Sequence, residues 1–105
     1  MSKYYILDKE NHPVECDREV WGGYLGSKNR IVARTEIEDC TISTVFLGLD
    51  HRFGDKGPPL LFETMIFKGK LDQDMWRYSS WDDAEVGHKA AVRKVQESIK
   101  SKNST

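Results

Sequence analysis

Residues 81–100, WDDAEVGHKAAVRKVQESIK, decide the fold of this chain. Apolar side chains recur in this stretch every three or four residues, which is the period of an α-helix with one buried side. Ser79 or Ser80 can cap the start of such a helix. We therefore predict an amphipathic helix over residues 81–100. The stripe on its buried side consists of Trp81, Ala84, His88, Ala91, Val92, Val95 and Ile99.

The middle of the chain predicts an antiparallel meander packed against this helix. Residues 31–38 alternate between apolar and polar side chains, the period of a strand with one buried face. Residues 41–49 are β-branched or aromatic with apolar groups on both faces, which is typical of a central strand covered on each side. Residues 60–67 predict a third strand, and residues 75–78 predict a short fourth one.

The first quarter of the chain predicts a small hairpin and a brief helix. Two strand-like runs, residues 4–7 and 13–16, flank turn residues at positions 8–11. Asp17 can cap a helix that ends at Gly26, although glycines inside it make that helix weak on intrinsic propensity.

Length and composition are those of one globular domain. The chain has 105 residues, of which 38% are hydrophobic and 31% charged, enough for a single core. We predict one α+β domain over residues 1–101, followed by a disordered tail over residues 102–105. Its parts are an antiparallel sheet of three to four strands, an N-terminal hairpin and the C-terminal amphipathic helix.

Charge, hydropathy and cysteine content argue against several classes of protein. A formal net charge of -1 gives little attraction to phosphate, so nucleic acid is not an expected partner. The apolar runs are far shorter than the roughly 20 residues that cross a bilayer, and the start of the chain lacks the features of a secretory signal. We therefore expect a cytoplasmic protein in which Cys16 and Cys40 are free thiols.

The loop over residues 50–59 is the most distinctive stretch for chemistry. It places an acid, an imidazole, a guanidinium and an aromatic ring directly after a predicted strand. In a functional interpretation, Asp50 orients His51 as an acid orients a base or a metal ligand, with Arg52 and Phe53 beside them. The commoner alternative is a structural loop, in which Asp50 or His51 binds backbone groups.

Two ionisable residues stand within apolar patterns. Glu63 shares a strand face with apolar neighbours, so it requires solvent, a ligand or a partner such as Arg34. His88 lies on the helix stripe next to Gly87, and a glycine there suggests the close approach of a ring or another backbone. A lone histidine of this kind is more often a satisfied core group than a ligand. If His51, Glu63 and His88 met in the fold, they could bind a divalent metal.

Trp76 and Tyr78 lie shortly before the start of the predicted helix. Aromatic side chains so placed stack on a base or a partner surface, or more commonly anchor a helix to a sheet. The sequence has no glycine-rich phosphate loop, no nucleophile motif and no zinc-ligand spacing, so we predict neither catalysis nor a cofactor. The predicted binding residues are Asp50, His51, Arg52, Phe53, Glu63, Arg34, Trp76, Tyr78 and His88.

Several stretches of this chain form a distinctive pattern: residues 42–54 (ISTVFLGLDHRFG), 57–67 (GPPLLFETMIF), 77–79 (RYS) and 87–88 (GH), with Tyr5, Asp8 and Pro13 in the opening. In these stretches the chain resembles a family of small uncharacterised proteins common in phage and prophage genomes.

The resemblance implies a context rather than a mechanism. Small phage proteins frequently inhibit host machinery by binding it, so the expectation is a non-catalytic inhibitor of a host defence or another host protein in the host cytoplasm. A protein that inhibits a host defence is a counter-defence factor. An alternative is a sponge for a small nucleotide or anionic signal that uses Arg34, His51 and Arg52 with stacking aromatics. A metal-assisted hydrolase is the weakest alternative.

A homodimer through an exposed edge strand is a further expectation for so small a domain.

Overall fold

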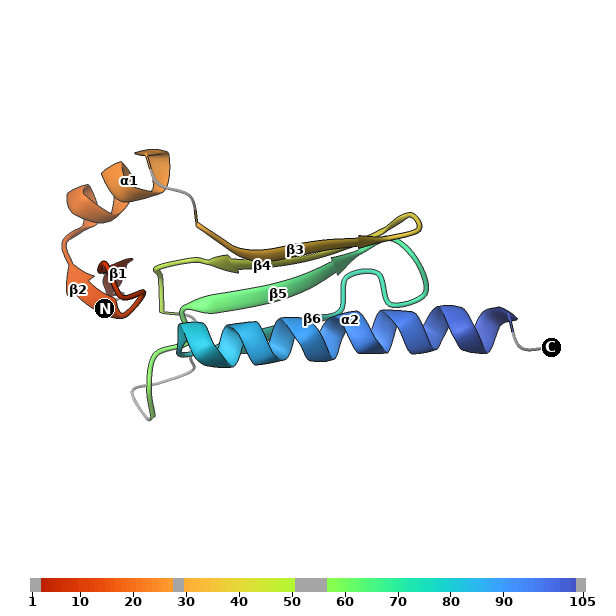
Figure 1. Cartoon of the computed structure of the whole chain (residues 1–105). Helices are drawn as coiled ribbons and strands as arrows, with labels where there is room; N and C mark the ends of the chain where they lie inside the picture. Colours follow the sequence, from red (N-terminus) through yellow and green to blue (C-terminus); the bar gives the residue numbers. More distant parts are fainter. Residues whose placement is uncertain (1–2, 28–29, 51–56, 104–105) are drawn as a thin grey trace.

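The computed structural model describes residues 3–27, 30–50 and 57–103. Their arrangement confirms the predicted α+β class: a four-stranded antiparallel sheet, a two-stranded N-terminal hairpin and a long C-terminal helix (Figure 1). The elements are β1 (Tyr4–Leu7), β2 (Pro13–Cys16), α1 (Arg18–Ser27), β3 (Ile31–Ile37), β4 (Cys40–Phe46), β5 (Phe62–Phe67), β6 (Met75–Tyr78) and α2 (Trp81–Asn103).

The larger sheet is the predicted meander, with strand order β3-β4-β5-β6. Each strand pairs antiparallel with its successor in the chain. Strand β3 carries one irregularity, a register shift between Ile31 and Ala33. The edges of this sheet are therefore β3 and the shorter β6.

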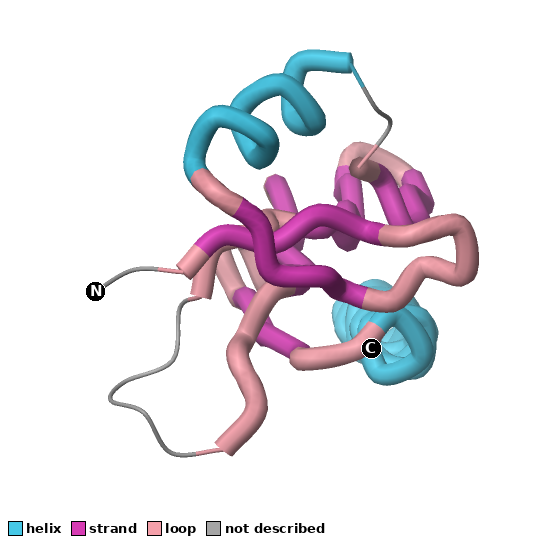
Figure 2. Tube along the Cα trace, turned by 90° about the vertical axis from the view of Figure 1, so that its left-hand side faces the viewer, coloured by secondary structure: helices cyan, strands magenta, loops and turns pink. Residues whose placement is uncertain are grey.

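Alternation along the strands divides the sheet into two faces. We call the side covered by α2 the inner face and the opposite side the outer face. Figure 2 looks at the molecule from the left of Figure 1 and shows α2 end-on beside the strands. Burial of the apolar inner side chains is the main stabilising contribution, about 1.5–3 kcal/mol for each large one. The fully buried apolar side chains are Ile42, Phe46, Leu61, Phe62, Ile66 and Ala84, with Ala91 and Val95 almost fully buried.

Strand β4 differs from its prediction in two ways. It ends at Phe46 rather than at residue 49, because Gly48 adopts a φ of 71° and turns the chain so that its carbonyl accepts the Tyr5 N–H at 2.7 Å. The expectation that both faces of this strand are covered is wrong. Only its inner face is buried, whereas Thr41 and Val45 on the outer face are half-buried.

The N-terminal elements dock on the end of the sheet. The Asp17 carboxylate accepts the Val20 N–H at 2.8 Å, which confirms the predicted cap of α1. The Trp21 indole N–H donates to the Leu47 carbonyl at 3.2 Å, and the Trp21 ring lies 4.9 Å from that of Tyr4. Tertiary contacts of this kind explain why a glycine-rich segment is helical despite its weak propensity.

Helix α2 begins as predicted and ends later. The Ser80 hydroxyl accepts the Asp83 N–H at 3.0 Å, so Ser80 is the capping residue. The helix continues to Asn103 rather than ending at residue 100, so Lys102 and Asn103 belong to the helix and not to the predicted tail. In the part of the chain that the structure describes, no helix is both long and apolar enough to cross a membrane.

Candidate functional site

His88 is the centre of a buried polar cluster between α2 and the sheet. Only 5% of the residue is exposed to solvent. Its Nε2 lies 2.8 Å from the Thr35 hydroxyl, and its Nδ1 lies 2.7 Å from the Thr44 hydroxyl. The Thr44 and Thr64 hydroxyls are in turn 2.5 Å apart. One imidazole thus connects α2 to three adjacent strands.

The cluster can be fully hydrogen-bonded with a neutral imidazole. If Nε2 carries the proton, it donates to Thr35 while Thr44 donates to Nδ1 and Thr64 donates to Thr44; the other tautomer reverses each direction. Burial lowers the pKa of His88 from its usual 6.5, because desolvation disfavours the imidazolium. The geometry is that of the satisfied core group that the sequence favours, since each ring nitrogen already has a protein partner.

The aromatic candidates anchor the helix rather than a ligand. A Cβ atom added to Gly87 would overlap the Tyr78 ring, so the ring packs directly on the helix backbone as that glycine suggested. Trp76 lies on the same face, with the Lys94 ammonium 5.7 Å from its ring centroid. Both rings therefore serve the sheet-to-helix contact.

Glu63 lies on the outer face in an ion pair. The Arg77 Nε–H donates to its carboxylate at 3.2 Å, and the two side chains face each other across β5 and β6. The predicted partner, Arg34, instead donates to Glu36 at 2.9 Å on the edge strand. Arg77 was missed because pairing between β5 and β6 depends on the turn between them, which the alternation within one strand does not reveal.

The predicted site residues do not come together. Glu63 and His88 lie on opposite sides of the sheet, because Glu63 is the neighbour of the inward-facing Thr64. Asp50 accepts the Leu60 N–H at 3.2 Å and so holds the base of the loop, as the structural interpretation expects. His51, Arg52 and Phe53 lie outside the described residues.

The described residues that were predicted for the hydrolase do not form one site, and neither do those predicted for the nucleotide sponge. Over residues 3–27, 30–50 and 57–103, no three His, Cys, Asp or Glu side chains are grouped so that they could hold a metal. For the nucleotide sponge, Arg34 is on the outer face whereas Trp76 and Tyr78 are on the inner one. Neither Cys16 nor Cys40 is in a disulfide, as predicted.

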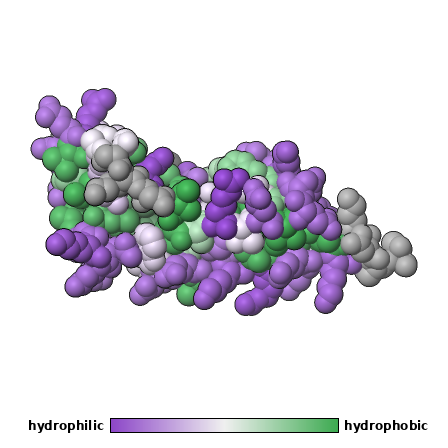
Figure 3. All heavy atoms as spheres, turned by 45° about the horizontal axis from the view of Figure 1, so that its top comes forward, coloured by the Kyte–Doolittle hydropathy of each residue, from purple (hydrophilic) through white to green (hydrophobic). Residues whose placement is uncertain are grey.

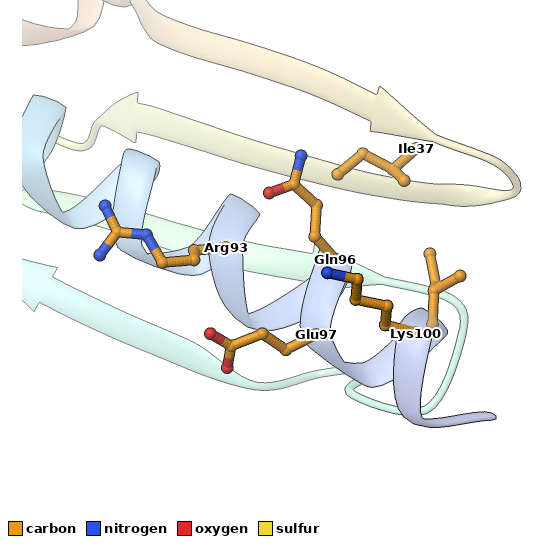
Figure 4. Close-up of a pocket in the computed structure, with 6 residues that line it drawn as sticks. Ile37, Arg93, Gln96, Glu97 and Lys100 are labelled. Carbon is orange, nitrogen blue, oxygen red and sulfur yellow. The ribbon is translucent and has the colours of Figure 1, made fainter. Parts of the chain in front are cut away.

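A shallow hollow lies between the C-terminal half of α2 and the end of β3. Figure 4 shows that most of its side chains come from the helix, with Ile37 contributed by the strand. It encloses about 550 Å³, but none of its lining side chains is buried and its charges have mixed sign. Such a hollow lacks the convergent, fixed polar groups of a small-molecule site. It is lined by Ile37, Arg93, Gln96, Glu97, Ile99 and Lys100.

The outer face of the sheet is a feature that the sequence interpretation missed. Three large apolar side chains on three different strands remain exposed there: Ile31 at 47%, Phe67 at 41% and Met75 at 43%. In Figure 3, where the top of Figure 1 comes forward, apolar side chains interrupt the polar surface over both the N-terminal elements and the sheet-and-helix body. A second hollow, of about 370 Å³, lies on this face and is lined by Ile31, Arg34, Thr41, Ser43, Val45 and Phe67.

A signal for this surface exists in the sequence. Alternation places Met65 and Phe67 on the same face as Glu63, for which the sequence favours a solvated or arginine-paired carboxylate over burial of that face. It proves to be the outer one, because the buried positions of β5 are the alternate residues Phe62, Thr64 and Ile66. One covering helix can bury only one side of the sheet.

Comparison with known proteins adds no relative: no protein-family model matches this chain, and neither a curated protein nor a solved structure is significantly similar to it.

Proposed function

We propose that this protein acts by binding another protein, without catalysis, and that the outer face of the sheet is the binding surface. The observation that carries this proposal is the exposure of Ile31, Phe67 and Met75 together on one side of the sheet. Exposed apolar side chains gathered on one face are typical of protein interaction sites.

The charges on this face favour a protein over an anionic ligand. Arg34 is paired with Glu36, and Arg77 is paired with Glu63, so the two arginines are neutralised within the face. A surface that bound nucleic acid or a phosphate would present unpaired cations. The expected partner is therefore a protein with an apolar patch of its own and no strong net charge.

The inner face supports the non-catalytic part of the proposal. His88 is enclosed beneath α2, with Thr35 and Thr44 on its two ring nitrogens. A catalytic base has to reach the proton that it abstracts. Following the resemblance to phage and prophage proteins, we propose a host protein as the partner and inhibition of that protein as the outcome.

The test is affinity capture with matched variants, followed by direct binding. Phe67→Thr together with Met75→Thr removes two exposed apolar side chains while keeping residues that suit a strand. Val86→Thr is the control, because Val86 is 69% exposed but lies on the solvent side of α2. Proteins retained from a host-cell extract by the wild type and by Val86→Thr, but lost with the double variant, are then purified and titrated by calorimetry.

We expect the double variant to bind the purified partner at least roughly tenfold more weakly, since each buried side chain contributes more than about 1.4 kcal/mol. The control should bind like the wild type. Equal affinity of the double variant and the wild type for the captured protein, or equal weakening by both variants, would contradict the proposal. Failure of the wild type to retain any protein would also count against it.

A further inference from the structure

Strand β3 presents an open edge with a regular central stretch. It spans seven residues, whereas β6 at the opposite edge spans four. The register shift between Ile31 and Ala33 separates the start of β3 from the regular stretch that follows it. That stretch, residues 33–37, is centred on Thr35.

The backbone groups of Arg34 and Glu36 point toward this open edge. The turn between β3 and β4 has two residues, so Ile37 and Cys40 flank it as a hydrogen-bonded pair. Along an antiparallel ladder such pairs alternate with non-bonded ones. Thr35 therefore directs its N–H and C=O toward β4, while Arg34 and Glu36 direct theirs away from it. On β4 the bonded positions continue at every second residue from Cys40 to Phe46, whose N–H donates to the Arg30 carbonyl at 2.9 Å, on the far side of the register shift in β3.

We propose that two copies of this chain pair antiparallel through β3, with Thr35 at the two-fold axis. In this register Arg34 of one copy lies opposite Glu36 of the other, and the symmetry repeats the contact. These two residues carry the outward backbone groups, so each such pair exchanges two backbone hydrogen bonds. Their side chains have opposite charge and both lie on the outer face, because their register partners on β4 are outer-face residues.

The same two charges select this register over its neighbours. A shift that brought the axis to Arg34 would place that arginine opposite its own copy, and a shift to Glu36 would place two glutamates opposite each other. Like charges directly opposite on paired strands are destabilising. Charged residues on an edge strand commonly prevent indiscriminate pairing. Here they permit one self-complementary alignment, which would join two sheets into a continuous eight-stranded one with a doubled outer face.

The test is a charge-exchange series measured by sedimentation velocity over a range of concentrations. Arg34→Glu puts two pairs of glutamates in contact, and Glu36→Arg puts two pairs of arginines in contact. Each single change should weaken self-association roughly 30-fold, taking about 1 kcal/mol for each of the two pairs. The double variant Arg34→Glu with Glu36→Arg should recover the wild-type association. An equimolar mixture of the two single variants should form heterodimers.

Lys3→Glu is the matched control, because it reverses a charge in another exposed ion pair, with Glu15 at 3.7 Å, away from β3. It should associate like the wild type. A wild type that stays monomeric over the whole range, or single variants that dimerise as tightly as the wild type, would overturn the proposal.

A second measurement covers the case in which a charge variant fails to fold. Residues opposite each other in a non-bonded antiparallel pair have Cα atoms about 4.5 Å apart, within reach of a disulfide. Thr35→Cys, in a Cys16→Ser background, should therefore form a covalent dimer on mild oxidation, and Thr41→Cys in the same background should not. Equal cross-linking of both variants, or of neither, would overturn the register.

Discussion

Replacing Gly87 with alanine tests how closely the sheet and helix pack. In an open helix this change is favourable by about 1 kcal/mol, because alanine has the higher helix propensity. Here the added Cβ would overlap the body of the Tyr78 ring, which is half-buried and paired across the strands with Phe62. Displacing a packed ring costs about 1–3 kcal/mol or slightly more. Because the propensity gain offsets part of this cost, we expect a net loss of about 1–2 kcal/mol.

Urea denaturation followed by circular dichroism measures this loss, and thermal unfolding should show a Tm lower by about 5–10 °C. The matched control is Gly22→Ala in α1, where the added Cβ would meet nothing within 4 Å. That variant should be more stable than the wild type by about 0.5–1 kcal/mol. With Tyr78→Leu as background, Gly87→Ala should cease to be destabilising. If Gly87→Ala alone is as stable as the wild type, the packing of Tyr78 described above is incorrect.

Three further predictions concern the polar groups. Thr44→Val should lower the free energy of unfolding by about 1–3 kcal/mol, because it leaves His88 Nδ1 without its buried partner, whereas Thr41→Val on the outer face should change it by less than about 0.5 kcal/mol. Because the pKa of His88 is lowered in the fold, the unfolded chain binds the extra proton first as pH falls below 6.5. Stability in urea titrations should therefore be full above that pH and decline below it until the folded-state pKa is passed, and a His88→Gln variant that declines equally would refute this. Asp17→Ala should cost about 1 kcal/mol through loss of the α1 cap and Asp17→Ser much less, and equal melting curves for the two would contradict that role.

The order and type of the elements could be predicted because their signals are local. Alternation in residues 31–37 and the helical stripe after residue 80 each depend on one stretch of chain. The early end of β4 could not be predicted, because it depends on the hydrogen bond that the Gly48 carbonyl accepts from the Tyr5 N–H, which belongs to an element far away in the sequence. The covering of β4 was misjudged for a similar reason: Val45 is apolar, but α2 reaches only the other side of its strand.

The candidate site was harder to predict than the fold. Reasoning from single residues identified His88 as a satisfied core group and Gly87 as a point of close approach. It did not identify Thr35 and Thr44 as the partners, since nothing in a strand shows which residue faces a helix 44 or more positions later. It included an arginine pair among the interpretations of Glu63 but named Arg34 as the example rather than Arg77, because ion pairs across strands depend on register.

The hydrogen bonds of His88 have a consequence for how α2 is aligned on the sheet. Its buried positions Ala84, Ala91 and Val95 are small and chemically similar, so the contacts of these three side chains alone would tolerate a slide of the helix along its own axis by one turn. Such a slide would carry the imidazole about 5.4 Å from Thr35 and Thr44 and leave it buried without its two hydroxyl partners. The His88 hydrogen bonds, together with the close fit of Gly87 against Tyr78, therefore fix the position of this helix along the sheet.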